Sequence, residues 1–352
     1  MTIYIGMISQ FSGSIKSLFD GYLNIAKDNY NIQELKDFLN IPCVQYRSGD
    51  KTPSFDKDSI IEFRNVSFKY PGSNNYALKD FNLTIRGNEK LCIVGCNGAG
   101  KSTMMNLISD NLTPSKGRVL LDGRGIDELG SEYRKLLGYM PQQQNIYPEL
   151  SLRRFLYFMA SLKGLKKSEA WEDIDHYVRM VKLDDVLGKK LGAFSGGMKQ
   201  RALIAQALIG NPGILILDEP TAGLDPKERV RFRNLISAFS KDRIVILSTH
   251  IVSDVEFIAE EIIMMKSGQI IHFGNPQEIT SEIDGQVWEC TVPTAYAEKY
   301  AAAYNTSNLR NISGNQTILR IIGDRPPMEN VVRVQPTLED LYLFYFKGGC
   351  EE

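Results

Sequence analysis

Short runs of apolar residues alternate with stretches of helical spacing along most of the chain after Ile60. Three of these runs, LCIVG at 91–95, ILILD at 214–218 and IVILS at 244–248, are rich in branched residues and end at turn residues. Strands buried on both faces of a parallel sheet carry such continuous runs, because helices pack against both faces. The pattern predicts an α/β core with a parallel sheet over residues 60–283.

Helical periodicity replaces the strand pattern in the middle of this core. Between Leu150 and Leu191 the apolar residues recur mostly at steps of three and four, as on one face of an amphipathic helix. We therefore predict a helical subdomain at about residues 143–202, inserted into the α/β core.

The residues before the core have a different texture. From Ile15 to Leu39 apolar positions again recur at steps of three and four, which predicts a helical N-terminal extension over residues 1–48. A polar stretch at 49–59 is interpreted as a linker. Two interpretations of the extension stay open, namely packing on its own chain and docking on a membrane partner.

After the core, residues 284–352 are predicted to form a small α+β appendage. The stretch VWECTV has the pattern of a strand, AYAEKYAAAY that of a helix and TILRII that of a second strand. The final stretch, TLEDLYLFYF, begins with Thr337, a residue typical of helix N-caps.

Composition and charge exclude several classes of protein. Hydrophobic residues make up 43% and charged residues 24% of the chain, which argues against disorder and against a membrane-embedded chain. The net charge of −1 provides no basic excess, so no nucleic-acid partner is expected. No apolar run is long enough to span a bilayer, and the N-terminus is a poor signal peptide. Five scattered cysteines fit a reducing compartment.

The stretch GCNGAGKST fits the phosphate-loop pattern G-x-x-x-x-G-K-[ST], and it lies between a predicted strand and a predicted helix. Its glycines allow backbone N–H groups to point inward, and the helix dipole adds positive charge. Lys101 would supply a full charge to the β and γ phosphates, and the Ser102 hydroxyl suits Mg²⁺. The loop predicts a nucleotide site that comprises Gly95, Cys96, Asn97, Gly98, Ala99, Gly100, Lys101, Ser102 and Thr103.

An acidic pair, Asp218 and Glu219, ends the run ILILD. Ligands of open α/β sheets bind at this carboxyl edge. Asp218 can hold the Mg²⁺ shell through water, and Glu219 can orient or deprotonate an attacking water. We predict that this pair lies on a strand next to that of the phosphate loop.

The third run ends in Thr249 and His250. We predict that His250 donates a hydrogen bond to the γ phosphate and senses its presence. His176 and His272 lie in a helical pattern and a predicted hairpin, and we assign both a structural role.

The octapeptide FSGGMKQR at 194–201 places a serine and two glycines where a helix begins. Such a helix start is typical of an anion site, but no lysine completes it. The residues alone leave open whose anion it binds.

With these motifs in order, residues 60–280 resemble the ATP-binding cassette (ABC) ATPases. The resemblance implies a P-loop NTPase fold that binds ATP and Mg²⁺. It also implies that Tyr70 stacks on adenine, that Gln142 touches Mg²⁺ and the water, and that Asp225 meets an opposite subunit. Glu219, His250, Gln142 and Lys101 would then be the catalytic residues.

In this family two nucleotide domains clasp two ATP molecules head to tail, as a homodimer or a pair of related ATPases. Ser195, Gly196 and Gly197 would cap the γ phosphate of an ATP held by the other chain, whose Lys101 supplies the missing charge. The family consensus here is LSGGQ, so Phe194 and Met198 are departures, and the resemblance does not define their side-chain contacts.

From about Met104 onward the chain resembles ATPases of exporters whose membrane permease is a separate chain, which would place it at the cytoplasmic face of the cell membrane. Its first hundred residues resemble fused exporters instead. The alternative is a soluble ABC ATPase acting on ribosomes or DNA, but those members carry two cassettes or a long coiled coil. A copy that binds ATP without hydrolysis is disfavoured, because the motif residues are all present.

Overall fold

The computed structural model describes residues 55–142, 146–221, 223–241, 243–249, 252–329 and 331–346. The predicted N-terminal extension, residues 49–54 of the predicted linker, and His250 lie outside the described residues. None of the helices in the described part of the chain combines the length and the apolarity needed to span a bilayer.

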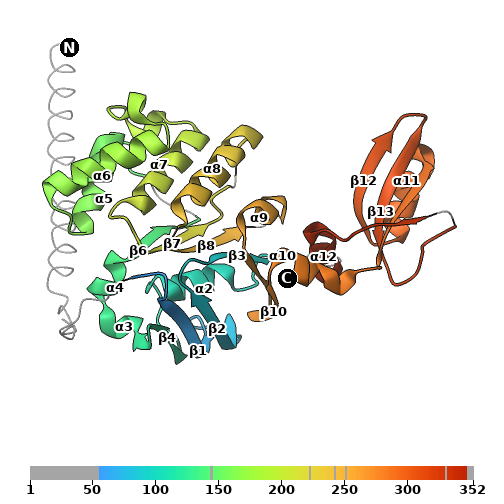
Figure 1. Ribbon diagram of the computed structural model, residues 1–352, viewed down its shortest axis with the longest axis horizontal. Helices are drawn as coiled ribbons and strands as arrows, with labels where there is room; N and C mark the ends of the chain where they lie inside the picture. The colour runs from blue at the N-terminus through green and yellow to red at the C-terminus, as the bar shows by residue number, and fades with distance from the viewer. Residues whose placement is uncertain are drawn as a thin grey trace, which may run out of the picture. The chain divides into compact units, whose positions relative to one another are not determined.

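The central sheet has six strands in the order β10-β9-β3-β8-β7-β6 (Figure 1). All neighbours pair in parallel except β9 and β10, which form an antiparallel hairpin. The strands are β3 (Lys90–Gly95), β6 (Leu137–Met140), β7 (Ile214–Asp218), β8 (Ile244–Thr249), β9 (Glu261–Lys266) and β10 (Gln269–Gly274). The three strands predicted from continuous apolar runs, β3, β7 and β8, are confirmed.

The prediction that the acidic pair lies on a strand next to that of the phosphate loop was wrong. β8 lies between β3, which leads into the phosphate loop, and β7, which ends in Asp218. A strand late in the sequence can insert between two earlier ones through a crossover, so strand order does not follow from the order of the motifs.

A second, antiparallel sheet has the order β2-β1-β4-β5. Its strands are β1 (Ile60–Phe68), β2 (Leu78–Arg86), β4 (Lys116–Leu121) and β5 (Arg124–Gly125). The helix α2 (Lys101–Ile108) shares one hydrophobic core with this sheet and with one face of the central sheet. Two short helices, α3 (Ile126–Leu129) and α4 (Ser131–Lys135), follow β5. This packing holds the start of α2 firmly against both sheets.

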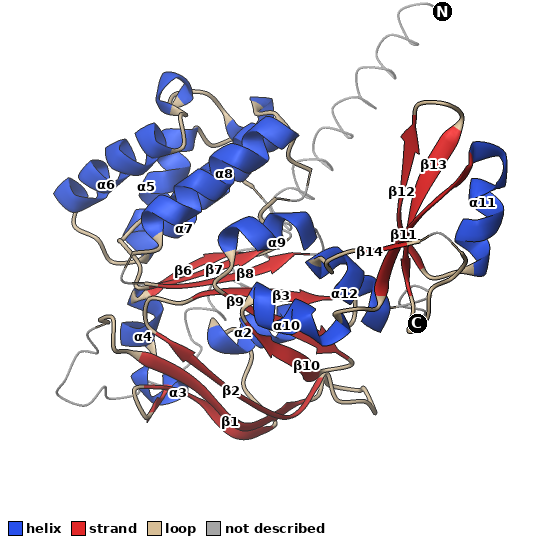
Figure 2. Cartoon of the chain, turned by 45° about the vertical axis from the view of Figure 1, so that its right-hand side comes forward, coloured by secondary structure: helices blue, strands red, loops and turns tan. Residues whose placement is uncertain are grey.

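A layer of helices covers the opposite face of the central sheet (Figure 2). It comprises α5 (Leu152–Leu162), α6 (Lys167–Met180), α7 (Gly196–Leu208), α8 (Pro226–Phe239) and α9 (Val252–Ile258), with short 3-10 helices at Asp184–Val186 and Leu191–Ala193. Alternate residues of β7 belong to different cores, because Leu215 and Leu217 pack with these helices while Ile214 and Ile216 pack with α2. Burial on both faces explains the continuous apolar runs.

Within the helical layer, the ammonium of Lys163 donates a hydrogen bond to the carbonyl of Ile209 beyond the end of α7. Burial lowers the pKa of Lys163 from 10.5 to about 8, although Asp173 opposes the shift. Between these values the unfolded chain binds more protons than the folded chain, so this residue makes the unfolding free energy rise with pH.

We therefore expect Lys163→Met to reduce the pH dependence of stability between about pH 8 and pH 10. The wild-type slope should exceed that of the variant by up to about 1.4 kcal/mol per pH unit. Urea unfolding of both proteins across this range measures the difference. Equal slopes would show that burial does not lower the pKa of Lys163.

The C-terminal sheet has the order β12-β13-β11-β14, and α11 (Thr294–Ala303) packs on one face. Its strands are β11 (Val287–Pro293), β12 (Thr306–Ile312), β13 (Gln316–Ile322) and β14 (Val332–Arg333). The predicted strand, helix and strand correspond to β11, α11 and β13. Sequence reasoning missed β12, because this edge strand is mostly exposed and has no alternating apolar positions.

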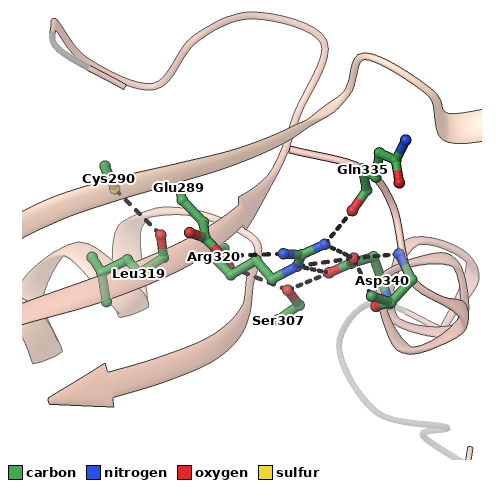
Figure 3. A network of polar contacts seen from close by, with 8 residues as sticks. Glu289, Cys290, Ser307, Leu319, Arg320, Gln335 and Asp340 are labelled. Atoms are coloured by element: carbon green, nitrogen blue, oxygen red, sulfur yellow. Dashed lines mark hydrogen bonds and ion pairs between the residues drawn. The ribbon is translucent and has the colours of Figure 1, made fainter. Parts of the chain in front are cut away.

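The helix α12 (Leu338–Tyr345) begins after Thr337, whose hydroxyl accepts a hydrogen bond from the Asp340 amide at 3.3 Å, as predicted. Arg320 of β13 binds the Asp340 carboxylate at 2.8 Å and Glu289 at 3.1 Å (Figure 3). Although burial acts to raise it, these hydrogen bonds hold the pKa of Asp340 below its usual value. The Leu338 amide also donates to Glu256 of α9 at 3.2 Å. Thus α12 joins the C-terminal sheet to α9 and, by packing, to α10 (Pro276–Thr280).

Candidate functional site

A cavity of about 460 Å³ lies where the phosphate loop leaves β3. Because β3, β6 and β7 run parallel, their carboxyl ends meet at this edge of the sheet. The cavity is lined by Tyr70, Ala77, Cys96, Asn97, Gly98, Ala99, Gly100, Lys101, Ser102, Thr103, Gln142 and Glu219. The structure thus brings together residues that were predicted from four separate stretches of the sequence.

Two glycines of the phosphate loop are required for different reasons. Gly100 has a φ of 98°, and a Cβ atom there would lie 2.8 Å from the Ala77 carbonyl oxygen. At Gly95 a Cβ atom would lie 2.4 Å from the carbonyl oxygen of Met265 in β9. Gly100 is also the N-cap of α2 and has no side chain to cap it, so the first N–H groups of the helix can face an anion.

The Lys101 side chain is only 6% exposed, and its ammonium donates to the carbonyl oxygens of Gly95 at 2.6 Å and Cys96 at 2.8 Å. Burial lowers the pKa of Lys101, whereas the negative charges of Glu219 and Asp218 oppose this shift. A buried cation is stabilised by a nearby anion. The phosphates of a nucleotide fit this requirement.

The acidic pair is held by β8. Asp218, the last residue of β7, is 3% exposed and accepts a hydrogen bond from the Ser248 hydroxyl. Glu219 follows with a φ of 50°, and its amide donates to the hydroxyl of Ser248 at 3.0 Å and to the Ser248 carbonyl at 3.2 Å. Sequence reasoning did not single out Ser248. The available signal was a serine at the carboxyl end of the apolar run IVILS.

The residues predicted to hold Mg²⁺ supply oxygen atoms only. Ser102 offers a hydroxyl and Gln142 an amide carbonyl, and both line the cavity. Asp218 offers a carboxylate directly before Glu219, whose side chain also lines the cavity. Mg²⁺ prefers such hard oxygen donors and keeps several waters, so this set fits the ion.

Tyr70 lies beside Thr103, where the phosphate loop leads into α2. Tyr70 is 44% exposed, its ring packs edge-on against Phe68, and its hydroxyl lies 3.1 Å from that of Thr103. An exposed aromatic face beside a phosphate loop can stack on a base.

Six predicted residues in the described part of the chain do not line this cavity. Gly95 and Asp218 directly precede the lining residues Cys96 and Glu219, whereas Ser195, Gly196, Gly197 and Asp225 belong to other segments. Ser195 is exposed and caps α7 by accepting a hydrogen bond from the Met198 amide at 3.3 Å. Asp225 is also exposed and caps α8 by accepting from the Glu228 amide at 2.8 Å. Both helix starts therefore face solvent in the single chain.

The second half of the octapeptide is anchored within its own chain. The Gln200 side-chain amide donates to the carbonyl of Pro220, directly after the acidic pair, at 2.6 Å. Arg201 donates to the carbonyls of Val181 at 3.0 Å and Lys182 at 2.9 Å. Phe194, which departs from the consensus, is 5% exposed in the hydrophobic core. The octapeptide thus exposes Ser195 and Gly196 to solvent, whereas Phe194, Gln200 and Arg201 are anchored within their own chain.

The remaining histidines fit the structural role predicted for them. His272 of β10 lies 3.1 Å from Glu282 and packs against Tyr345. His176 lies on α6 and packs edge-on against Tyr177. The predicted role of His250 stays a prediction, since this residue is not among the described ones.

Comparisons with known proteins agree with this geometry. A family model described as "ABC transporter" matches residues 78–222, which include the phosphate loop, Gln142, the octapeptide and the acidic pair. The uncharacterized ABC transporter ATP-binding protein YxlF of Bacillus subtilis (strain 168) is 35% identical over 217 residues, which are 61% of this chain and 72% of YxlF. ABC transporter A family member 8 of Dictyostelium discoideum is 32% identical over 215 residues, 61% of this chain but 26% of that protein.

Among solved structures, the ATP-binding cassette MJ0796, a dimer in a post-hydrolysis state bound to ADP and Pi, is 30% identical with a TM-score of 0.56. The match covers 61% of this chain and 98% of MJ0796.

Proposed function

Because the chain belongs to the ABC transporter ATP-binding proteins, we propose that it hydrolyses ATP in the cavity at the end of β3 and thereby powers export through a separate membrane permease. The observation that carries this proposal is the convergence of the phosphate loop, Gln142 and Glu219 on one cavity. This combination supplies both a phosphate-binding wall and a general base.

Each residue has a defined part in the proposed reaction. The Lys101 ammonium exchanges the carbonyls of its own loop for β- and γ-phosphate oxygens, and Tyr70 stacks on adenine. Glu219 accepts the proton of the water whose oxygen attacks the γ phosphorus, while the bond from the γ phosphorus to the bridging oxygen breaks and ADP leaves. Ser102, Gln142 and Asp218 would hold Mg²⁺, which neutralises charge on the phosphate oxygens.

The exposed helix start of α7 supports a role in a second active site. Ser195, Gly196 and Gly197 would cap the γ phosphate of an ATP held by another chain, and Asp225 would lie at the same interface. MJ0796 forms a dimer, which agrees with this arrangement. The partner would be a second copy or a related ABC ATPase. Loss of the γ phosphate then opens the dimer, which couples hydrolysis to motion.

The match to YxlF supports a separate permease. This match covers 72% of that ATP-binding protein, whereas the match to ABC transporter A family member 8 covers only 26% of that protein. We place the chain at the cytoplasmic face of the cell membrane, bound to its permease. Co-purification with ribosomes or DNA in place of membranes would favour the soluble alternative.

The purified chain should hydrolyse MgATP slowly, and Lys101→Ala should weaken ATP binding by about 10- to 100-fold, because charge-assisted hydrogen bonds to phosphate are lost. Titration with a fluorescent ATP analogue and an assay of phosphate release measure both effects. Lys79→Ala, at an exposed position of β2, is the matched control and should behave like wild type. Wild-type ATP affinity in Lys101→Ala would contradict the proposed site.

A further inference from the structure

Ser248 contacts both members of the acidic pair with a single side chain. This residue of β8 is fully buried and pairs with Asp218 across the sheet. Its hydroxyl donates to an Asp218 carboxylate oxygen and accepts from the Glu219 amide at 3.0 Å. Its carbonyl also accepts from that amide, at 3.2 Å.

The direction of these hydrogen bonds is fixed by their chemistry. A hydroxyl has one proton and two lone pairs, whereas a backbone amide can only donate. Because Glu219 occupies a lone pair of Ser248, the hydroxyl proton is left for Asp218. The bond therefore orients the Asp218 carboxylate plane and the direction of its second oxygen.

The same contacts hold the backbone of Glu219 in an unfavourable conformation. Its φ of 50° lies in the left-handed region, which residues with a Cβ atom avoid. The Ser248 hydroxyl accepts a hydrogen bond from the Glu219 amide, and the Gln200 side chain donates one to the carbonyl of the next residue, Pro220, at 2.6 Å. The backbone is thus fixed on both sides of Glu219, whose side chain lines the cavity.

We propose that Ser248 is a positioning residue for ATP hydrolysis, which sets the Asp218 carboxylate for Mg²⁺ and the Glu219 carboxylate for the attacking water. This inference rests on the proposed function. Among the described residues Ser248 does not line the cavity, so it acts through the acidic pair and not through nucleotide contacts. A serine that only satisfied its own buried hydroxyl would affect stability alone.

Replacement of Ser248 by alanine tests the inference. The kcat of Ser248→Ala should fall by about 10- to 100-fold, as for other residues that orient metal ligands, and KM for ATP should change little. The Mg²⁺ concentration that half-saturates binding of a fluorescent ATP analogue should rise roughly 10-fold, while binding in EDTA stays at the wild-type value. Ser248→Thr keeps a hydroxyl and should recover most of both losses.

Ser240→Ala is the matched control, since Ser240 is 2% exposed and, within the described part of the chain, its hydroxyl donates to the Ser237 carbonyl alone, at 3.1 Å. It should keep the wild-type kcat and Mg²⁺ requirement. If Ser248→Ala does not fold, Ser248→Cys keeps the volume with a weaker donor and should show the same shifts.

Wild-type kcat and Mg²⁺ requirement in folded Ser248→Ala or Ser248→Cys would overturn the inference while leaving the proposed function intact. The proposed function fails separately, if the wild-type chain has no MgATP hydrolysis that depends on Glu219.

Discussion

Glu219→Gln is expected to lower the rate of ATP hydrolysis by about 100- to 10,000-fold without loss of ATP binding. Glutamine has the size of glutamate and can still accept a hydrogen bond from water, but it cannot take the proton. Ser248 accepts a hydrogen bond from the Glu219 amide, and Gln200 donates one to the Pro220 carbonyl. Because both bonds fix the backbone, the substitution should leave the site geometry unchanged. Phosphate release and analogue binding measure the two effects separately.

The same variant should accumulate as a dimer at saturating MgATP, because the γ phosphate that bridges the two chains is not removed. Light scattering after size-exclusion chromatography, with and without MgATP, measures the molecular mass. Glu172→Gln, at an exposed position of α6, is the control and should stay active. A monomeric Glu219→Gln variant at saturating ATP would contradict the proposed ATP-bound dimer. An unchanged rate of ATP hydrolysis would exclude Glu219 as the general base.

The parts of the fold that the sequence predicted are those where one physical constraint acts on consecutive residues. β7 and β8 are buried on both faces, so every position in each run is constrained to be buried, and apolar residues dominate both runs. The phosphate loop is similarly local, because its motif residues are consecutive and the φ of 98° at Gly100 favours a glycine at that position.

The parts that the sequence did not predict depend on contacts between distant segments. Ser248 lies 30 positions after Asp218, and only the pairing of β7 with β8 brings the two side chains together. The position of β8 between β3 and β7 has the same origin. β12 was not predicted because its side chains are mostly exposed and show no apolar alternation, so only backbone pairing with β13 defines it.

The octapeptide FSGGMKQR contains one feature that local sequence predicted and one that depends on a contact between distant segments. Its serine at a helix start was predictable from local chemistry, and the structure places it as the N-cap of α7. The bond from Gln200 to Pro220 was not predictable, because it depends on how α7 packs against the end of β7. One segment thus faces solvent at Ser195 and supports the acidic pair of its own chain at Gln200.

We propose that Ser195 serves the ATP of another chain, and a mixture of two inactive variants tests this arrangement. Lys101→Ala removes the charge that binds phosphate, and Ser195→Arg places a bulky cation where the partner's γ phosphate should bind. Each variant alone has two defective sites. A mixed dimer has one site that pairs an intact phosphate loop with an intact octapeptide.

An equal mixture should therefore recover about a quarter of the wild-type hydrolysis rate, since random pairing makes half of the dimers mixed and each has one working site. The phosphate-release rate of the mixture is compared with that of each variant alone, and circular dichroism confirms that both are folded. A rate in the mixture no higher than the average of the two separate variants would contradict this arrangement, because Ser195 would then serve its own chain.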